Sequence, residues 1–305
     1  MSILEHPAIA SFLREHANHS SVARPLAVFD CDGTVIRGDI GESMFYRQIE
    51  QFHFRRSPAE LWTDHPERGR IDKLYLALAE RSVDKLRQSP EFDEFAEILL
   101  AWYFGQIAAG KVIKACADIV RLFAGYSVDE IHGFAKATFE EQIAAPLGER
   151  RLGERTLPLG IRFLRETRDL LRELQLLHFD IWAVSGSFRW SVVPVFGALG
   201  VPADRVIGIE LRTDNGVCTG EAVTPIPIWG GKIDALRLRT PSPPSLVASD
   251  SKNDLPLFRY SSGLKVRINS RRRSTDDFFR NAGITRDKSW VVVEEPAILD
   301  HLPHA

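Results

Sequence analysis

Short apolar runs alternate with longer amphipathic stretches along this chain of 305 residues. The runs have the length of buried strands, and most end in small or polar residues that are typical of turns. They lie at residues 25–29, 180–184, 205–210, 246–248, 264–268 and 290–294. Residues 161–177 and 187–199, between these runs, show the apolar spacing of helices. Strands that alternate with helices predict an α/β fold with a Rossmann-like, mostly parallel sheet flanked by helices.

The segment between the first two strands is long and almost entirely helical in pattern. Apolar residues recur at helical spacing from about residue 39 to residue 142, and Ser127 with Glu130 forms a capping box at the last helix start. A strand–helix–strand crossover needs only about thirty residues, so the excess must be an inserted unit. We therefore expect an all-helical cap at residues 41–144 and a core made of residues 1–40 and 145–305.

The strongest chemical signal is Asp30-Cys31-Asp32-Gly33-Thr34, directly after the first apolar run. Side chains two apart in a strand point to the same side, so Asp30 and Asp32 are expected together at its carboxyl end, where open α/β sheets bind ligands. Adjacent carboxylates repel each other unless a cation lies between them or one is protonated. Mg²⁺ suits such a pair because it prefers oxygen ligands. The alternative is a solvated strand end with an Asx turn.

Later segments extend this pattern. Residues 180–187 form an apolar strand that ends in a Ser-Gly-Ser turn, Lys232 stands at the start of a helical stretch, and a third strand ends at Asp250 and Asp254. Aspartates at a first strand end, serine at a second, then lysine and a further acidic pair resemble the ordered motifs of the haloacid dehalogenase (HAD) superfamily. The resemblance covers the chain from about residue 26 to residue 293.

The position of the expected cap narrows this resemblance. The cap follows the first motif, and the stretch from Ser185 to Lys232 has room only for a helix, a strand and a hairpin with its turn at 214–216. This arrangement is similar to the C1-capped HAD branch, which includes phosphoserine phosphatases and phosphorylcholine phosphatases. One departure is Ser249 before Asp250, where the family usually has glycine.

The resemblance assigns roles to the acidic motifs. Asp30 would be the nucleophile that becomes an aspartyl phosphate, and Asp32 would protonate the leaving group and then deprotonate the attacking water. Mg²⁺ would be held by the Asp30 carboxylate, the Asp32 backbone carbonyl and the Asp250 carboxylate. Asp254 would orient a water at the metal or the Lys232 side chain, or it is only a helix cap.

Phosphate binding is assigned to the second and third motifs. Ser185 and the backbone N–H of Gly186 stand just before a helix and would donate to phosphate oxygens. Lys232 would add positive charge to the transferring group and take part in catalysis. Asn253 would contact substrate or phosphate. The alternatives are that Ser185 is only an N-cap and that Lys232 is a solvated lysine.

Fewer residues indicate the substrate. Residues 35–43 resemble the phosphorylcholine-phosphatase type, in which an acidic residue at the position of Glu42 contacts a cationic amine. Asp39 and Glu42 also have the spacing of a capping box, which needs no ligand, and both interpretations stay open. Aromatic residues of the cap would enclose a quaternary ammonium or simply form its core. They are Phe45, Tyr46, Trp62, Trp102, Tyr103 and Phe104.

Composition narrows the classes of partner and compartment. The formal net charge of −2 creates no field toward nucleic acid, and there is no apolar run long enough to span a membrane. The start of the chain lacks the pattern of a signal peptide, and the 3 cysteines are far apart, so we expect a cytoplasmic protein. The basic cluster at residues 271–273 is interpreted as a solvated turn. Nothing in the sequence indicates an oligomeric state.

The motifs together predict a Mg²⁺-dependent phosphatase that hydrolyses a small phosphorylated metabolite, a phosphate monoester that carries an amine if Glu42 contacts it. A phosphotransferase or mutase would use the same motifs, with another hydroxyl in place of water. The alternative from another class is a catalytically silent HAD-fold binding protein, which loss of Asp30, Asp32, Lys232 or Asp250 would favour. All of these are present. A haloacid dehalogenase, which needs neither a metal nor an acid at Asp32, is disfavoured.

Overall fold

The computed structural model describes residues 2–17, 24–269, 273–281, 289–294 and 296–299. The chain forms two compact units. Unit 1 consists of Met1–Asp39, Ile161–Gly208 and Pro225–Ala305, and unit 2 consists of Ile40–Gly160 and Ile209–Thr224. Within the described residues, no helix combines the length and the apolar composition needed to cross a bilayer. Of the basic cluster, Arg271 and Arg272 lie outside the described residues.

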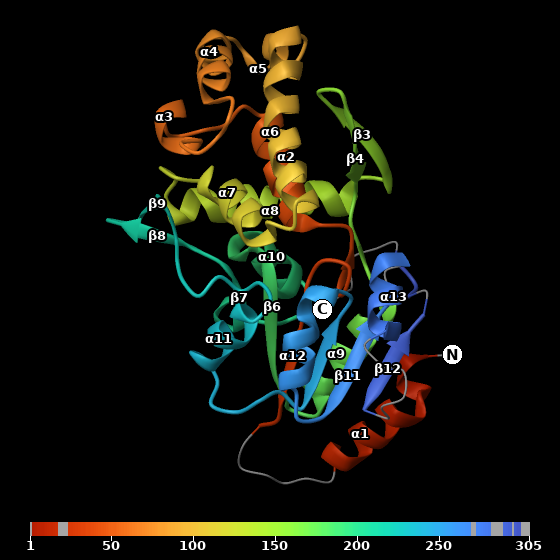
Figure 1. Ribbon diagram of the computed structural model, residues 1–305. Coiled ribbons are helices and arrows are strands. Elements are labelled where there is room, and N and C mark those ends of the chain that lie inside the picture. Colours follow the sequence, from red (N-terminus) through yellow and green to blue (C-terminus); the bar gives the residue numbers. More distant parts are fainter. Residues whose placement is uncertain (1, 18–23, 270–272, 282–288, 295, 300–305) are drawn as a thin grey trace. The chain divides into compact units, whose positions relative to one another are not determined.

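Unit 1 is built on a 6-stranded sheet with the order β12-β11-β10-β1-β6-β7 (Figure 1). Its strands are β1 (Leu26–Phe29), β6 (Asp180–Phe188), β7 (Val206–Ile209), β10 (Leu246–Ser249), β11 (Leu264–Ile268) and β12 (Trp290–Val293). Strand β1 pairs in parallel with β6 and β10, β10 pairs in parallel with β11, and β11 with β12. The expected α/β fold with a mostly parallel sheet is confirmed.

Strand β1 lies at the centre of this sheet and explains where a ligand would bind. Every residue of β1 is buried, as expected for a parallel strand that is covered on both faces. The chain continues from β1 to β6 on one side and later returns to β10 on the other. The crevice outside the carboxyl ends at such a reversal of strand order is where open α/β sheets bind ligands. Asp30 and Asp32 follow directly from this strand end.

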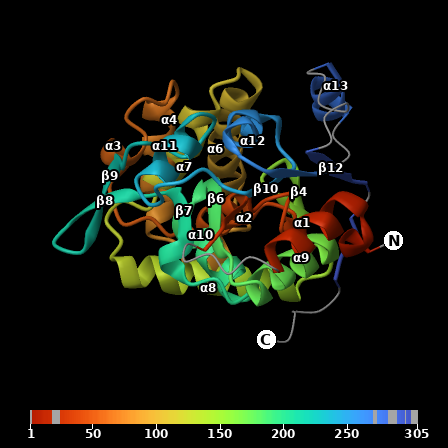
Figure 2. The ribbon, with the colours of Figure 1, turned by 90° about the horizontal axis from the view of Figure 1, so that it is seen from below.

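Helices cover both faces of the unit 1 sheet. In Figure 2, α11 and α12 lie on one side of strands β6, β7 and β10, and α1 and α9 lie on the other. On the first side, Val28, Trp182 and Val247 pack against helix residues such as Leu236 and Phe258. The helices are η1 (Ile3–Glu5), α1 (Pro7–Ala17), α9 (Arg165–Leu176), α10 (Arg189–Gly197), η2 (Ala203–Arg205), α11 (Gly231–Arg237), η3 (Lys252–Asp254), α12 (Leu255–Tyr260) and α13 (Arg273–Asn281).

Helix α9 begins later than the apolar spacing predicts. The pattern favours a helix from residue 161, but β5 (Arg162–Phe163) pairs antiparallel with β2 (Ile36–Arg37). This pairing holds the first residues extended, and the helix starts only at Arg165. Pairing between residues distant in sequence outweighs the local preference here.

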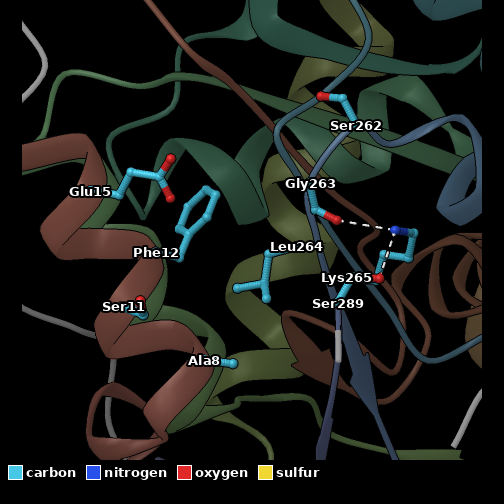
Figure 3. Close-up of a pocket in the computed structure, with 9 residues that line it drawn as sticks. All are labelled: Ala8, Ser11, Phe12, Glu15, Ser262, Gly263, Leu264, Lys265 and Ser289. Carbon is cyan, nitrogen blue, oxygen red and sulfur yellow. Dashed lines mark hydrogen bonds between the residues drawn. The ribbon is translucent and has the colours of Figure 1, made fainter. Parts of the chain in front are cut away.

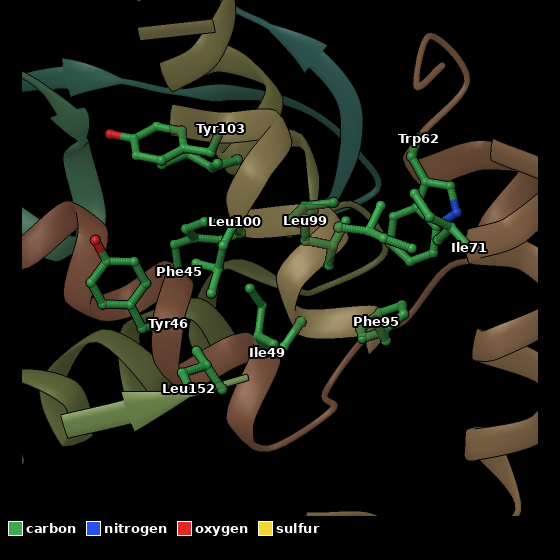
Figure 4. Close-up of a cluster of buried hydrophobic side chains, with 14 of the residues drawn as sticks. Phe45, Tyr46, Ile49, Trp62, Ile71, Phe95, Leu99, Leu100, Tyr103 and Leu152 are labelled. Atoms are coloured by element: carbon green, nitrogen blue, oxygen red, sulfur yellow. The ribbon is translucent and has the colours of Figure 1, made fainter. Parts of the chain in front are cut away.

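Unit 2 contains the long helical segment. Residues 40–144, all of which the structure describes, hold helices and their connections. The helices are α2 (Ile40–Glu50), α3 (Pro58–Leu61), α4 (Arg68–Ala79), α5 (Val83–Leu86), α6 (Pro90–Ala108), α7 (Val112–Arg121) and α8 (Val128–Ala144). The capping box of Ser127 and Glu130 at the start of α8 is confirmed. Large apolar side chains such as Trp62, Phe95 and Leu99 fill the core of this unit (Figure 4).

Unit 2 also includes two hairpins, β3 (Gly148–Leu152) with β4 (Arg155–Leu159), and β8 (Leu211–Asp214) with β9 (Val217–Ala222). Leu152 and Leu157 of the first belong to the apolar core of unit 2. The second hairpin is hydrogen-bonded through its backbone to the connection between α7 and α8. The Cys218 N–H donates to the Tyr126 carbonyl at 2.7 Å, and the Cys218 carbonyl accepts from the Gly125 N–H at 2.8 Å. These contacts explain why both hairpins belong to unit 2.

Candidate active site

The loop after β1 turns sharply and is held by its own backbone. The Asp30 N–H donates to the carbonyl of Ala248 on β10 at 3.0 Å, which continues the sheet pairing by one residue. Gly33 has φ of +76°, a conformation that favours glycine, and its N–H donates to the Ile36 carbonyl at 2.8 Å. The loop therefore returns on itself and presents the Asp30 and Asp32 side chains at the carboxyl end of the sheet.

Lys232 is the centre of a buried ionic group. Its Nζ lies 3.0 Å from Asp30 Oδ1 and 2.7 Å from Asp254 Oδ2. Lys232 is 4% exposed, Asp30 6% and Asp254 0%. A buried lysine needs such partners, because an uncompensated buried charge is strongly destabilising. Three motifs that lie far apart in the sequence therefore meet at one ammonium group.

The electrostatics of this group favour a proton on Asp30. Burial raises the pKa of Asp30 to about 8, Lys232 opposes this shift, and the carboxylates of Asp254 and Asp250 add to it. Burial alone lowers the pKa of Lys232, but Asp254 and Asp30 outweigh burial and raise it above its usual range. These surroundings therefore favour the charged form of Lys232 and, unless further positive charge is supplied, the protonated form of Asp30.

Lys232 is positioned by a tight turn before α11. Trp229 has φ of +55°, and a Cβ at Gly231 would come 2.0 Å from the Ile226 carbonyl oxygen. Only glycine fits this approach at position 231, so the chain can fold closely over itself and begin α11 at once. Lys232 is the second residue of that helix and extends into the sheet end.

Asp250 is packed against the Asp30 loop. Its backbone N–H donates to Thr34 Oγ1 at 2.9 Å, and Thr34 Oγ1 lies 3.5 Å from Asp250 Oδ1. A Cβ on Gly33 would lie 2.4 Å from Asp250 Oδ2. Asp250 and Thr34 are both buried. The glycine of the first motif is thus required twice, for its positive φ and for the close approach of this carboxylate.

Ser249 contributes a further hydrogen bond to the ionic group. Its Oγ donates to Asp254 Oδ2 at 2.6 Å and accepts from the Ser251 N–H at 3.1 Å. Asp254 Oδ2 therefore receives hydrogen bonds from both Ser249 and Lys232. The other oxygen, Asp254 Oδ1, is buried and has no hydrogen-bond partner among the described residues.

The serine-rich end of β6 lies beside Asp32. Ser187 Oγ donates to Asp32 Oδ2 at 2.7 Å, and the Ser187 N–H donates to Ser185 Oγ at 3.1 Å. A hydroxyl that accepts a hydrogen bond still has its own proton to donate. Ser185 is 1% exposed. Gly186 lies between them, where a Cβ would be 3.1 Å from Ile228 Cγ1.

The donor set fits a hard divalent cation. Asp30 and Asp250 supply oxygen ligands. Burial, together with the carboxylates of Asp254 and Asp250, raises the pKa of Asp30, and a cation bound there would oppose this shift. In the described part of the chain, no group of three or more His, Cys, Asp or Glu side chains forms a ready metal site. A site made of two carboxylates and a backbone carbonyl would not require such a group.

Glu42 has its described contacts within unit 2. It is partly exposed on α2, and its carboxylate accepts hydrogen bonds from Tyr46 Oη at 2.7 Å and Tyr103 Oη at 3.0 Å. Both tyrosine rings pack against Phe45, with ring centroids 5.9 and 5.5 Å away. Figure 4 shows both hydroxyl groups turned away from Trp62 and the rest of the core.

A separate hollow in unit 1 lies between α1 and the start of β11 (Figure 3). Its volume is about 490 Å³, and residues such as Phe12, Leu264 and Lys265 line it. Leu264 is the first residue of β11, whereas Asp30 follows the last residue of β1. In a parallel sheet the first residues and the last residues of the strands lie at opposite ends of the strands. This hollow is therefore distinct from the group around Lys232.

The structure brings most of the predicted site residues of unit 1 together. Asp30, Lys232 and Asp254 form the buried ionic group, while Asp250 packs on the Asp30 loop. Asn253 lies in η3, where its N–H donates to Ser251 Oγ at 3.1 Å.

Sequence reasoning assigned no role to Thr34, Ser187 or Ser249. Each is a hydroxyl residue within or beside a motif, which could have marked it as a hydrogen-bond donor. Its partner could not be predicted, because that partner depends on which strands lie side by side.

Two solved structures show what the fold resembles. A conserved functionally unknown protein from Anaerococcus prevotii superimposes with a TM-score of 0.73 and 17% identity, covering 93% of this chain and 91% of that one. A protein with unknown function from Bordetella pertussis gives a TM-score of 0.55 and 15% identity, covering 89% of this chain and 99% of that one. At these identities the likeness concerns the fold alone.

Sequence comparison is more informative about the family. A phosphoserine phosphatase from Halobacterium salinarum is 31% identical over 104 residues, which are 32% of this chain and 49% of that protein. The match thus spans about half the length of that relative. The profile of the haloacid dehalogenase-like hydrolases matches residues 27–259, a range that contains all four motifs and most of the chain. The protein therefore belongs to the haloacid dehalogenase-like hydrolase family.

Proposed function

We propose that this protein is a phosphatase that hydrolyses small phosphate monoesters through an aspartyl phosphate on Asp30. The observation that carries the proposal is the contact of Lys232 Nζ with both Asp30 Oδ1, at 3.0 Å, and Asp254 Oδ2, at 2.7 Å. A buried ammonium beside a carboxylate at a strand end can neutralise a phosphate oxygen next to its attacker.

Asp30 and Asp32 divide the chemistry between them. An Asp30 carboxylate oxygen attacks phosphorus, the bond from phosphorus to the leaving oxygen breaks, and Asp32 gives that oxygen a proton. Water then attacks the phosphorus of the aspartyl phosphate and transfers a proton to Asp32. The bond between phosphorus and the Asp30 oxygen breaks, inorganic phosphate leaves, and Asp30 is again a carboxylate while Asp32 again carries its proton.

Mg²⁺ is the proposed cofactor. The Asp30 and Asp250 carboxylates and the Asp32 backbone carbonyl would hold it. Asp254 would orient a water at the metal or the Lys232 side chain. When bound, it supplies positive charge that offsets the negative charge of the phosphate and of the carboxylates. That charge would also favour the ionised form of Asp30, which is the nucleophilic one.

Ser185 and the N–H of Gly186 are proposed to bind the phosphate oxygens. Ser185 Oγ already accepts a hydrogen bond from the Ser187 N–H. The hydroxyl proton of Ser185 therefore points away from Ser187 and can be donated to another group. Lys232 supplies a compact positive charge to the same group. Asn253 is proposed to add a polar contact to substrate or phosphate.

The substrate is proposed to carry an amine. Glu42 would pair with its ammonium, and the hydroxyls of Tyr46 and Tyr103 hold that carboxylate in place. The relative from Halobacterium salinarum is a phosphoserine phosphatase by name, and phosphoserine is a monoester with an amine. The alternative is that Glu42 has a purely structural role, since its two hydrogen bonds to tyrosine hydroxyls need no ligand.

A phosphate-release screen tests the proposal. The full chain is incubated with phosphorylated metabolites, with Mg²⁺ or with excess chelator, beside an Asp30→Asn variant. We expect Mg²⁺-dependent release that the variant lacks, because an amide does not form the acyl phosphate. Rapid turnover by folded Asp30→Asn, or full activity in chelator, would contradict it. Added acceptor alcohols report whether phosphate goes to water or to a second hydroxyl.

A further inference from the structure

The two acidic groups of the first motif are held in different ways. Asp30 is 6% exposed and fixed by the buried Lys232, whereas Asp32 is only partly buried. Ser187 Oγ donates to Asp32 Oδ2 at 2.7 Å. The two residues are 155 positions apart in the chain. This bond is thus a product of the fold and not of local sequence.

The segment that offers the Ser187 hydroxyl is itself well fixed. Strands β1 and β6 pair in parallel up to Phe29 and Ala183, and both chains continue beyond this pair to Asp32 and Ser187. The Ser187 N–H is bound to Ser185 Oγ at 3.1 Å. At the preceding Gly186 a Cβ would lie 3.1 Å from Ile228 Cγ1, which is a tight approach.

We propose that Ser187 is a positioning residue that holds the Asp32 carboxylate in the rotamer needed for proton transfer to the leaving group. This inference rests on the proposed phosphatase function and deepens it. A partly exposed aspartate has several accessible rotamers. Fixing it in one of them loses conformational entropy, and this loss adds to the activation free energy unless the folded protein already holds that rotamer. The hydrogen bond from Ser187 fixes Oδ2 and with it the orientation of the whole carboxylate.

A serine hydroxyl is suited to this role because it both donates and accepts. It can rotate and stay bonded to Asp32 before and after the proton moves to the leaving oxygen. Ser187 itself gains and loses no proton in the cycle. Its effect should therefore follow Asp32 and be felt only where the leaving group needs a proton.

The test compares two phosphate esters in kcat/KM with Mg²⁺ saturating. An alkyl phosphate that the wild type hydrolyses needs a proton on its leaving oxygen, whereas p-nitrophenyl phosphate releases a stable anion. Since kcat/KM covers the steps up to loss of the leaving group, it isolates the contribution of the acid. We expect Ser187→Ala to lower kcat/KM about tenfold for the alkyl ester and less than about twofold for the aryl ester.

Two variants of equal shape separate hydrogen bonding from packing. Ser187→Thr keeps a hydroxyl and should retain most of the alkyl-ester activity, whereas the isosteric Ser187→Val should behave like Ser187→Ala. Ser191→Ala is a matched control, because its buried hydroxyl donates to the Phe188 carbonyl at 2.8 Å and not to Asp32. It should lower the melting temperature at most and leave the ratio of the two substrates unchanged.

A double-mutant cycle with Asp32→Asn completes the test. If Ser187 acts through Asp32, adding Ser187→Ala to Asp32→Asn should produce no further loss on the alkyl ester. Equal losses on both esters, or a full additional loss in the Asp32→Asn background, would overturn the inference. An Asp32→Asn variant with wild-type alkyl-ester activity would instead overturn the proposed acid itself. The two failures are therefore distinguishable.

Discussion

Ser249 and Asp254 share a hydrogen bond of 2.6 Å between Oγ and Oδ2, and both residues are 0% exposed. The same carboxylate oxygen receives Lys232 Nζ at 2.7 Å. A glycine at position 249 could make no such bond. In this chain the serine before Asp250 therefore helps to fix the carboxylate that holds the central lysine.

Ser249→Ala should lower the free energy of unfolding by about 1.5–3 kcal/mol, because a hydrogen bond to a buried charged acceptor is lost. Urea unfolding of the metal-free protein measures it. Ser261→Ala is the matched control, since its buried hydroxyl donates to the neutral Pro244 carbonyl at 3.0 Å. That control should cost only about 0.5–1.5 kcal/mol. A Ser249 loss no larger than the Ser261 loss would show that the carboxylate is held without the serine.

Gly33→Ala should disturb the Asp250 carboxylate as well as the backbone. Gly33 and Gly216 have almost the same φ, +76° and +79°, but only at Gly33 would a Cβ meet Asp250 Oδ2, at 2.4 Å. At Gly216 nothing lies within 4 Å. Gly216→Ala should therefore cost about 1–2 kcal/mol of backbone strain, and Gly33→Ala clearly more.

The binding of Mg²⁺ should separate these two glycine variants further. Thermal unfolding with increasing Mg²⁺ reports its apparent affinity. We expect a weaker stabilisation by Mg²⁺ in Gly33→Ala and an unchanged one in Gly216→Ala. Equal behaviour of the two variants would argue against a role for the contact between Gly33 and Asp250.

The stability of the metal-free protein should depend on pH through Asp30. Burial, with Asp254 and Asp250, raises the folded-state pKa of Asp30 from 3.8 to about 8. Between these values the folded state binds more protons than the unfolded state, so this contribution makes stability fall as pH rises from about 4 to about 8. Asp30→Asn removes it.

The difference in melting temperature between wild type and Asp30→Asn, measured in excess chelator, isolates this contribution. Relative to the variant, the wild type should become progressively less stable toward pH 8. A difference that is constant with pH, or that changes in the opposite direction, would show that Asp30 is already ionised in the metal-free protein.

Glu42→Gln should raise KM for amine-bearing phosphates and leave p-nitrophenyl phosphate almost unaffected, because the variant keeps the size of the side chain but loses its charge. Glu50→Gln is a control on the same helix, where the carboxylate pairs with Arg150 at 2.8 Å. It should change stability and leave the substrate preference intact. Equal losses of Glu42→Gln on both substrates, with a lower melting temperature, would mean that Glu42 is structural only.

Much of the fold was readable from local pattern. The apolar run that becomes β1 and the helical spacing from about residue 39 to residue 142 are patterns of neighbouring residues, and continuous apolar runs are typical of buried parallel strands. The hairpin of β3 and β4 was missed, because Gly148–Leu152 carries charged residues and little apolar alternation. Its strands form because each supplies the backbone partner of the other.

The sequence by itself determined which chemical groups this protein has and that their motifs belong to a haloacid dehalogenase-like hydrolase. Only the tertiary structure decided how these groups are paired. Ser187 meets Asp32, and Lys232 lies between Asp30 and Asp254, because strands distant in the chain end at one edge of the sheet. Hydrogen bonds of this kind depend on sheet register, burial and side-chain rotamer, which are properties of the packed molecule that no short stretch of sequence specifies.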